Sequence, residues 1–341
     1  MFGDSLSDNG NLAEALGAFP NPPSFHDSFT NGPTAVVDLA SGLGLSLTPS
    51  LWLTGFHDAR NLFGGSSYVP GTNYAVAGAT AAAQAVGGPA SINLPQQVGV
   101  YSSYSGDHAD PNALYVVMIG GNDVRNATLQ GTGAGAVQTG VSTEIASIKA
   151  LATIGARDFL VVNVPNVGII PEFAQDDPTQ AAAAATYSVL YDQELSAGLA
   201  SLSVPSGTSL TPFDLYSFDN NIVNNAASYG LSNATDRCYT NTPFTAATTA
   251  QCGPNAQNIG SFVYWDSIHP TAGVHALWAG GFEAALGVAT PVPEPPAALL
   301  LGTGLLGMLA FAWRRSAVGK CPRRPQMGGQ PGEAFDGVEV A

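Results

Sequence analysis

A serine near the start of the chain lies in a pattern that could make its hydroxyl a nucleophile. Ser5 follows the pair Gly3-Asp4 and precedes a segment that could begin a helix. A serine on a tight strand-to-helix turn presents its hydroxyl, and the backbone N–H groups that follow can stabilise an oxyanion. Asp and Ser are also common turn residues, so a helix N-cap is the alternative role for Ser5.

An acid and an imidazole lie three residues apart in the segment Trp265 to Pro270. This spacing allows Asp266 to hold the ring of His269 while the ring activates a serine from elsewhere in the chain. A purely structural role is the alternative for His269. The remaining histidines lack such a context and are expected to be surface or packing residues: His26, His57, His108 and His275.

Two further segments could supply hydrogen-bond donors to a developing negative charge. Gly120-Gly121-Asn122-Asp123 follows an apolar run, at the strand end where open parallel sheets place their ligands. Asn73 to Thr80 is rich in small residues, and Gly78 within it could offer its backbone N–H. A turn role for Asn122 and close packing for Gly78 are the alternatives. Three acids are expected to organise these loops: Asp4, Asp8 and Asp123.

Strand and helix patterns alternate along the chain in the manner of an α/β protein. Leu114–Ile119 and Phe159–Val164 are uninterrupted apolar runs, typical of strands buried on both faces of a parallel sheet. Residues 217–262 are rich in Asn, Thr and Gly and are expected to form a long loop. Helical spacing of apolar residues and a further short run predict two helices and a strand: Gly140–Leu151, Thr179–Leu202 and Ser209–Tyr216.

Taken together, these blocks resemble the SGNH, or GDSL, hydrolase family, named for its Ser, Gly, Asn and His. They occur in the family's order across residues 2–270, and FGDSLSDNGN, GGND and DSIHPT are most similar to phospholipase/lecithinase/haemolysin-type esterases. The resemblance implies a three-layer α/β/α sandwich with a mainly parallel central sheet, as in flavodoxin-like folds. It also implies a catalytic set and an oxyanion hole: Ser5, Asp266 and His269 for the first, and Ser5, Gly78 and Asn122 for the second.

The activity implied is hydrolysis of a small-molecule or lipid ester through an acyl-enzyme intermediate, with no cofactor. No Cys/His cluster suggests a metal site. Phospholipids, short acyl esters and acetylated polysaccharides all stay open as substrates, and loops within residues 20–32, 52–72 and 217–262 are expected to form the specificity pocket. Since a fold does not fix a function, two alternatives remain: an inactive binding or matrix protein on a hydrolase scaffold, and a polysaccharide deacetylase.

The family fold places a central strand directly before the nucleophile, yet only Met1 and Phe2 precede Gly3. The first strand is therefore expected to be missing from this chain. Export would also need an N-terminal signal peptide, which this chain does not show. Both observations favour a reading frame that begins upstream.

The charge of the chain is strongly acidic and unevenly spread. The 341 residues carry a net charge of −15, and residues 1–296 alone hold five basic and 22 acidic side chains. Such a charge repels phosphate backbones and excludes sequence-independent binding of nucleic acid. With 45% apolar residues, the chain can nevertheless bury a large core.

The carboxyl-terminal part has the composition of a membrane-inserting tail. Pro291 to Pro296 is a stiff, Pro-rich segment, Ala297–Trp313 is a run of 17 uncharged residues, and Arg314-Arg315 follows at once. About 17–25 residues are needed to cross a bilayer, and the basic stop favours a membrane helix over the alternative of a buried core helix.

The order Pro-Glu-Pro, apolar helix and Arg cluster resembles the PEP-CTERM sorting signal of Gram-negative envelope proteins. The resemblance implies an exosortase-type sorting protease as partner and a transient inner-membrane anchor through residues 297–313. It also implies a location in the cell envelope or outside the cell. The expected organisation is a hydrolase domain over 1–290, a linker over 291–296, a sorting helix with its Arg stop over 297–315 and a disordered tail over 316–341.

Two cysteines bear on the compartment. Cys238 and Cys252 flank a stretch rich in Thr, Asn and Gly, with 13 residues between them. A disulfide between them would staple this loop and would suit an oxidising envelope or exterior. Two unrelated thiols are the alternative.

Overall fold

The computed structural model describes residues 1–17, 24–54, 71–82, 92–239 and 259–288. They belong to a unit that runs from Met1 to Thr290. The expected linker, sorting helix and tail lie outside the described residues, so they and the domain boundaries stay predictions. Within the described ranges, no helix combines the length and the apolar character that crossing a membrane requires.

Four parallel strands form the central sheet, in the order β1-β2-β3-β4. The apolar runs that predicted two buried strands form β2 and β3, and both are buried almost throughout. The α/β fold with a parallel central sheet is therefore confirmed. The strands are β1 (Phe2–Gly3), β2 (Leu114–Met118), β3 (Asp158–Val162) and β4 (Ser209–Phe213).

The expectation that the first strand is missing is wrong, because a short strand precedes Ser5 in the sheet. β1 is only two residues long, but Gly3 pairs in parallel with Met118 of β2. On its other side, the Tyr74 N–H donates to the Met1 carbonyl at 2.8 Å, and the Val76 N–H donates to the Gly3 carbonyl at 3.1 Å. Hydrogen bonds to distant segments thus hold the strand from both sides. A local sequence pattern cannot predict them.

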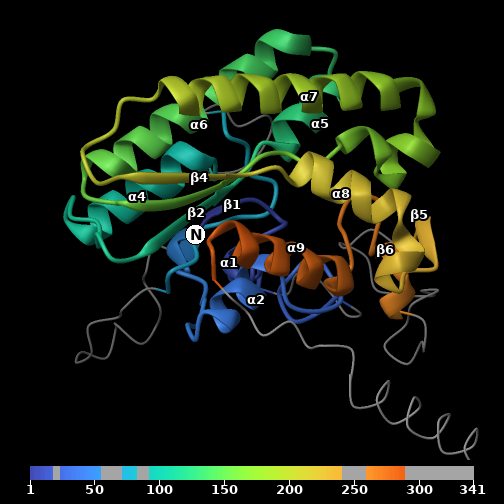
Figure 1. Ribbon diagram of the computed structural model, residues 1–341, viewed down its shortest axis with the longest axis horizontal. Helices are drawn as coiled ribbons and strands as arrows, with labels where there is room; N and C mark the ends of the chain where they lie inside the picture. The colour runs from blue at the N-terminus through green and yellow to red at the C-terminus, as the bar shows by residue number, and fades with distance from the viewer. Residues whose placement is uncertain (18–23, 55–70, 83–91, 240–258, 289–341) are drawn as a thin grey trace, which may run out of the picture. The chain divides into compact units, whose positions relative to one another are not determined.

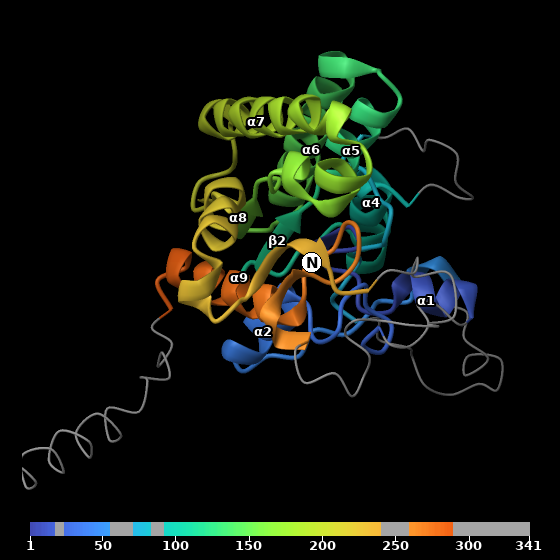
Figure 2. The same ribbon diagram turned by 90° about the vertical axis from the view of Figure 1, so that its right-hand side faces the viewer.

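Helices cover both faces of the sheet (Figures 1 and 2). α4, α5, α6 and α7 lie on one face, and α2 and α9 pack together on the other, as a three-layer sandwich requires. The two helices predicted from apolar spacing form most of α6 and nearly all of α7. The helices are α1 (Asn11–Leu16), α2 (Ala35–Gly42), α4 (Leu94–Ser105), α5 (Gly121–Leu129), α6 (Gly133–Thr153), α7 (Pro178–Ser201), α8 (Leu215–Asn224) and α9 (Ala272–Ala285).

The expected long loop over 217–262 is wrong for its described parts. α8 continues to Asn224, and its buried face repeats at Leu215, Asp219 and Ile222, a helical spacing that the Asn-rich composition concealed. β5 (Asn233–Arg237) then pairs in parallel with β6 (Phe262–Tyr264) in a separate two-stranded sheet.

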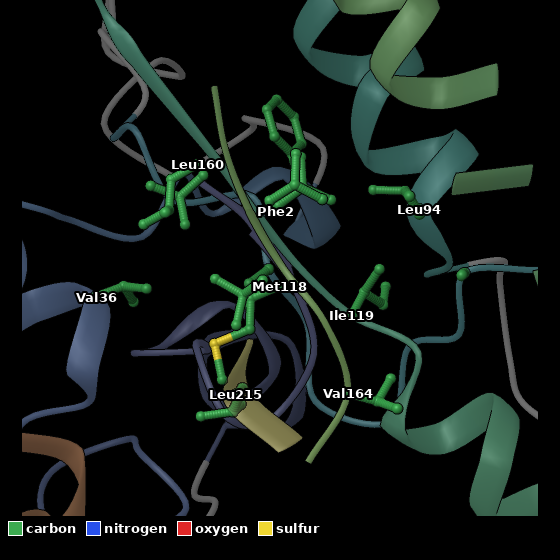
Figure 3. Close-up of a cluster of buried hydrophobic side chains, with 14 of the residues drawn as sticks. Phe2, Val36, Leu94, Met118, Ile119, Leu160, Val164 and Leu215 are labelled. Atoms are coloured by element: carbon green, nitrogen blue, oxygen red, sulfur yellow. The ribbon is translucent and has the colours of Figure 1, made fainter. Parts of the chain in front are cut away.

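The core joins side chains of the sheet to side chains of the helices on both of its faces (Figure 3). Each of these side chains is almost fully buried, so the central strands have little freedom to shift. Because the loops after β1 and β2 leave from this core, their starting points are fixed. The labelled residues are Phe2, Val36, Leu94, Met118, Ile119, Leu160, Val164 and Leu215.

Candidate active site

Ser5, His269 and Asp266 form a continuous chain of hydrogen bonds. The His269 Nε2 atom lies 2.8 Å from the Ser5 Oγ atom, although 264 positions separate the two residues. The Nδ1 atom of the same ring lies 2.8 Å and 3.0 Å from the two Asp266 carboxylate oxygens. The ring can therefore take a proton from the serine while the carboxylate holds its other nitrogen.

Asp266 is buried and held by the backbone of its own loop. Its Oδ1 atom accepts hydrogen bonds from the N–H groups of Ile268 at 2.8 Å and His269 at 2.7 Å. Burial by itself raises the pKa of Asp266, but the His269 ring and these hydrogen bonds outweigh it and hold the pKa below its ordinary value. Asp266 therefore stays ionised and fixes the orientation of the ring.

The loop that carries His269 is anchored to the end of segment 20–32, which was expected to form part of the specificity pocket and not to hold the histidine. The Thr30 hydroxyl donates to the Pro270 carbonyl at 2.9 Å, and the Ala272 N–H donates to the Asn31 side-chain oxygen at 2.7 Å. Each contact spans about 240 positions of the chain. No local motif could have signalled it, because the pairing exists only in the folded chain.

The loop after β1 is held by a glutamine of α4. The Gln97 side chain makes two hydrogen bonds to the backbone of Gly3: its Nε2 donates to the carbonyl at 2.8 Å, and its Oε1 accepts from the N–H at 2.9 Å. The buried Asp4 carboxylate accepts from the Leu6 N–H at 3.0 Å, and burial raises the pKa of Asp4 to about 7. Ser5 thus lies between Asp4 and Leu6, which this hydrogen bond joins. Spacing in the sequence gave no signal for Gln97.

Asp8 links the loop of the serine to the loop that contains Gly78. Its carboxylate accepts hydrogen bonds from the backbone N–H groups of Gly10, Asn11 and Leu12 at 2.9, 2.8 and 3.2 Å. It also accepts from the Ala77 N–H at 2.9 Å, across 69 positions. Burial raises the pKa of Asp8 to about 6, and these hydrogen bonds limit the rise. The expected role of Asp8 in organising the loop agrees with these contacts.

Asn122 and Gly78, the two expected oxyanion donors outside the serine loop, lie close together, because Asn122 bonds to Ala79, the residue that follows Gly78. The Asn122 Nδ2 group donates to the Ala79 carbonyl at 2.9 Å. An amide nitrogen carries two hydrogens, so the second one is left for a ligand in the cleft that Asn122 and Ser5 line. Gly78 is exposed and has a φ of +84°, which favours glycine. Gly78 is not among the described residues that line this cleft, but it directly precedes Ala79.

The loop after β2 rests on a buried polar layer. Asp123 accepts hydrogen bonds at 2.7 and 3.0 Å from the N–H groups of Ala81 and the residue after it. Gly120 has a φ of +110°, and a Cβ there would lie 2.4 Å from the ring of Tyr191. The Tyr191 hydroxyl in turn donates to Glu144 at 2.6 Å, and burial raises the pKa of Glu144 to about 8. This layer sets the position of the first turn of α5, which carries Asn122.

A cleft opens beside Ser5 with a largely apolar wall, and Arg125, which lines it, is held by an ion pair with Glu172. Arg125 and Glu172 form a two-pronged salt bridge with N–O distances of 2.5 and 2.6 Å. Of the loops expected to form the specificity pocket, the described residues contribute only Asp219; the segment 165–170 was not expected to take part. The lining residues are Asp4, Ser5, Leu6, Gly121, Asn122, Arg125, Pro165, Val167, Ile170, Asp219, Tyr264, Ile268, Pro270 and Trp278.

The expectations for the other histidines and for the cysteines can be compared with the structure only where the residue is described. His275 is a packing residue, as expected: it is buried, and its Nδ1 accepts from the Ala35 N–H at 3.2 Å. Burial, with His269 nearby, lowers the pKa of His275 to about 3. Cys238 is buried and disulfide-bonded, whereas Cys252 and His57 lie outside the described residues. Across the described ranges, His, Cys, Asp and Glu side chains form no group of three suited to hold a metal.

Comparison with known proteins gives a consistent result. A model of the GDSL-like lipase/acylhydrolase family matches residues 1–282. The thermolabile hemolysin of Vibrio parahaemolyticus is 27% identical over 288 residues, which span 80% of this chain and 60% of the hemolysin. The GDSL esterase/lipase LIP-4 of Arabidopsis thaliana is 28% identical over 313 residues, or 81% and 82% of the two chains. Lipase 1 of Photorhabdus luminescens is 31% identical over 178 residues, which span 51% of this chain and 23% of the lipase.

Proposed function

The chain belongs to the GDSL-like lipase/acylhydrolase family of ester hydrolases, and we propose that it cleaves carboxylic esters through an acyl-enzyme intermediate on Ser5. The observation that carries this proposal is the hydrogen-bonded chain from Ser5 through His269 to Asp266. A protein that only bound a ligand would not need a nucleophile, a base and a buried carboxylate joined by hydrogen bonds.

The chemistry follows from the contacts. As the Ser5 Oγ attacks the ester carbonyl carbon, its proton passes to the His269 Nε2, and the Asp266 carboxylate stabilises the imidazolium that forms. Negative charge gathers on the carbonyl oxygen, where we place the N–H groups of Ser5, Gly78 and Asn122. Collapse of the intermediate expels the alcohol, which takes the proton from His269. Water then attacks the acyl carbon while His269 takes one of its protons. Collapse of the second intermediate breaks the bond to the Ser5 Oγ, releases the carboxylic acid and returns the proton from His269 to Ser5.

Kinetics of single and double variants test this assignment. Because the members of such a set act as a unit, we expect Ser5→Ala and His269→Ala each to cost about as much kcat/KM as the double variant. Asp266→Asn should cost less. Ser7→Ala is the matched control, since it removes a buried hydroxyl from the same loop that has no hydrogen-bond partner among the described residues. A double variant far below both singles, or a Ser7→Ala loss as large as that of Ser5→Ala, would overturn the proposal.

We propose further that the carboxyl-terminal region is a sorting signal of the PEP-CTERM type. The order of Pro293-Glu294-Pro295, the uncharged run Ala297–Trp313 and Arg314-Arg315 supports this, because such a run can just span a bilayer and the arginines resist translocation. An exosortase-type protease would release the hydrolase domain outside the inner membrane. Mass spectrometry of the mature carboxyl terminus after fractionation decides it. Cytoplasmic protein that retains Ala341 would contradict the proposal.

The proposed location makes a prediction about the cysteines. Cys238 is disulfide-bonded, and we propose Cys252 as its partner because the two flank one short segment of the chain. A disulfide persists in an oxidising compartment outside the cytoplasm. Non-reducing peptide mapping of protein from the envelope or medium should recover the Cys238–Cys252 peptide pair. Recovery of a Cys238–Cys321 pair would contradict this pairing.

A further inference from the structure

Two polar groups in the wall of the cleft are buried without a hydrogen-bond partner among the described residues, and a buried carboxylate lies in the same wall. The Tyr264 hydroxyl and the Trp278 indole nitrogen are buried and make no hydrogen bond within the described part of the chain. The Asp219 side chain is 4% exposed, and no backbone N–H among the described residues donates to it. All three line the cleft beside Ser5. Burying such groups without partners costs free energy, so a ligand that supplies partners is favoured there.

The three side chains come from three different elements. Asp219 lies on the buried face of α8, Tyr264 ends β6, and Trp278 lies on the buried face of α9. Burial raises the pKa of Asp219 to about 7, and the interaction of its carboxylate with the Trp278 side chain offsets part of that rise. Burial raises the pKa of Tyr264, and the charge of Asp219 raises it further. Because all three residues also line the same cleft, their polar groups can contact one ligand.

The donors and acceptors of this cluster match a hydroxyl group. A carboxylate accepts, an indole N–H only donates, and a phenol hydroxyl does either. A ligand hydroxyl can donate to Asp219 and accept from Trp278 or Tyr264 at the same time. An alkyl chain would leave all three groups unpaired, and an ammonium group would leave the indole donor unpaired.

We propose that Asp219, Tyr264 and Trp278 form a subsite for a hydroxyl group of the substrate, so that the enzyme prefers hydroxyl-bearing esters over alkyl esters of the same shape. This rests on the proposed function, because the subsite lines the cleft in which Ser5 would attack. The hydroxyl could belong to the alcohol half, as in a glycerol or sugar ester, or to the acyl half, as in a hydroxyacyl ester.

Two matched pairs of esters distinguish these sources. For the alcohol half, 2,3-dihydroxypropyl butyrate is compared with 2-methylbutyl butyrate, in which methyl groups replace the hydroxyls. For the acyl half, 4-nitrophenyl 6-hydroxyhexanoate is compared with 4-nitrophenyl heptanoate. We expect kcat/KM to favour the hydroxyl-bearing member of one pair by about tenfold or more, because unpaired polar groups penalise the alkyl member.

Variants assign the preference to the three residues. Tyr264→Phe and Asp219→Asn should each reduce the preference about tenfold, because the hydroxyl loses a partner and the alkyl group no longer leaves that partner unpaired. Continued turnover of the alkyl esters reports that the variant is folded. Tyr229→Phe is the control, since it removes a hydroxyl that bonds to Asn221 and does not line the cleft. The preference should survive in it.

Each outcome decides between the two proposals. Turnover of alkyl esters without any preference in either pair, or a preference that survives in both Tyr264→Phe and Asp219→Asn, overturns the subsite alone. Failure of the wild-type chain to cleave any of the four esters overturns the proposed function and the subsite with it.

Discussion

At the residue scale, the motifs indicated which side chains meet in the candidate active site better than they indicated the residues that hold these side chains in place. Ser5, Asp266 and His269 could be identified because their chemistry requires a short, recognisable spacing on each loop. Gln97 and Thr30 could not, because each acts through a backbone atom far away in the sequence. The same is true of Asp219, whose environment depends on two other elements.

Replacement of Asn122 tests the oxyanion hole. The side-chain amide should bond to the carbonyl oxygen most strongly as that oxygen becomes negative, so Asn122→Ala should lower kcat by about 10²–10³ with little change in KM. Asn126→Ala, one turn further along α5 and outside the cleft, should leave kcat unchanged. Equal kcat values for wild type and Asn122→Ala would make Asn122 a turn residue only.

At the element scale, buried strands and long helices were predictable and contact-dependent elements were not. β2, β3 and α7 each carry a continuous pattern of their own. β1 has only two residues and is defined by its neighbours, and α8 combines one buried face with an Asn-rich exterior. Composition therefore did not predict β1 and α8, which depend on hydrogen bonds and packing with other parts of the chain.

Gly120 tests how tightly the loop after β2 is packed. A Cβ at this position would meet the Tyr191 ring at 2.4 Å and would also strain a φ of +110°. Gly120→Ala should lower the free energy of unfolding by about 2–4 kcal/mol and reduce activity, because the start of α5, which carries Asn122, must move. Gly131→Ala is the control, since its φ is +63° but the space around it is open.

Urea unfolding followed by circular dichroism measures both variants. Gly131→Ala should lose only about 1 kcal/mol, the cost of the backbone conformation alone. Equal losses for the two variants would show that the Tyr191 contact contributes nothing.

At the scale of the whole molecule, buried acids should make the fold more stable at mildly acidic pH. Burial raises the pKa of several carboxyl groups above the value of about 4 expected in the unfolded chain. The folded protein then holds protons that the unfolded chain releases, so stability falls as the pH rises from about 5 to about 8. These groups have pKa values of about 6 to 8: Asp4, Asp8, Asp123, Glu144, Asp192 and Asp219.

Melting temperatures between pH 5 and pH 8 check this prediction. Glu144→Gln should flatten the decline, because the amide cannot ionise and still accepts the Tyr191 hydrogen bond. Glu14→Gln, on the exposed side of α1, should keep the wild-type slope. A melting temperature that rises with pH in the wild type would reverse the sign of the argument.

The central claim is that Ser5 is the nucleophile, and covalent labelling tests it most directly. A fluorophosphonate reacts with a serine only where a base and an oxyanion hole activate it. Peptide mapping by mass spectrometry should find one label per chain, on Ser5, and no label on the His269→Ala variant. Stoichiometric labelling of any other residue, or undiminished labelling of Ser5 in His269→Ala, would contradict the account.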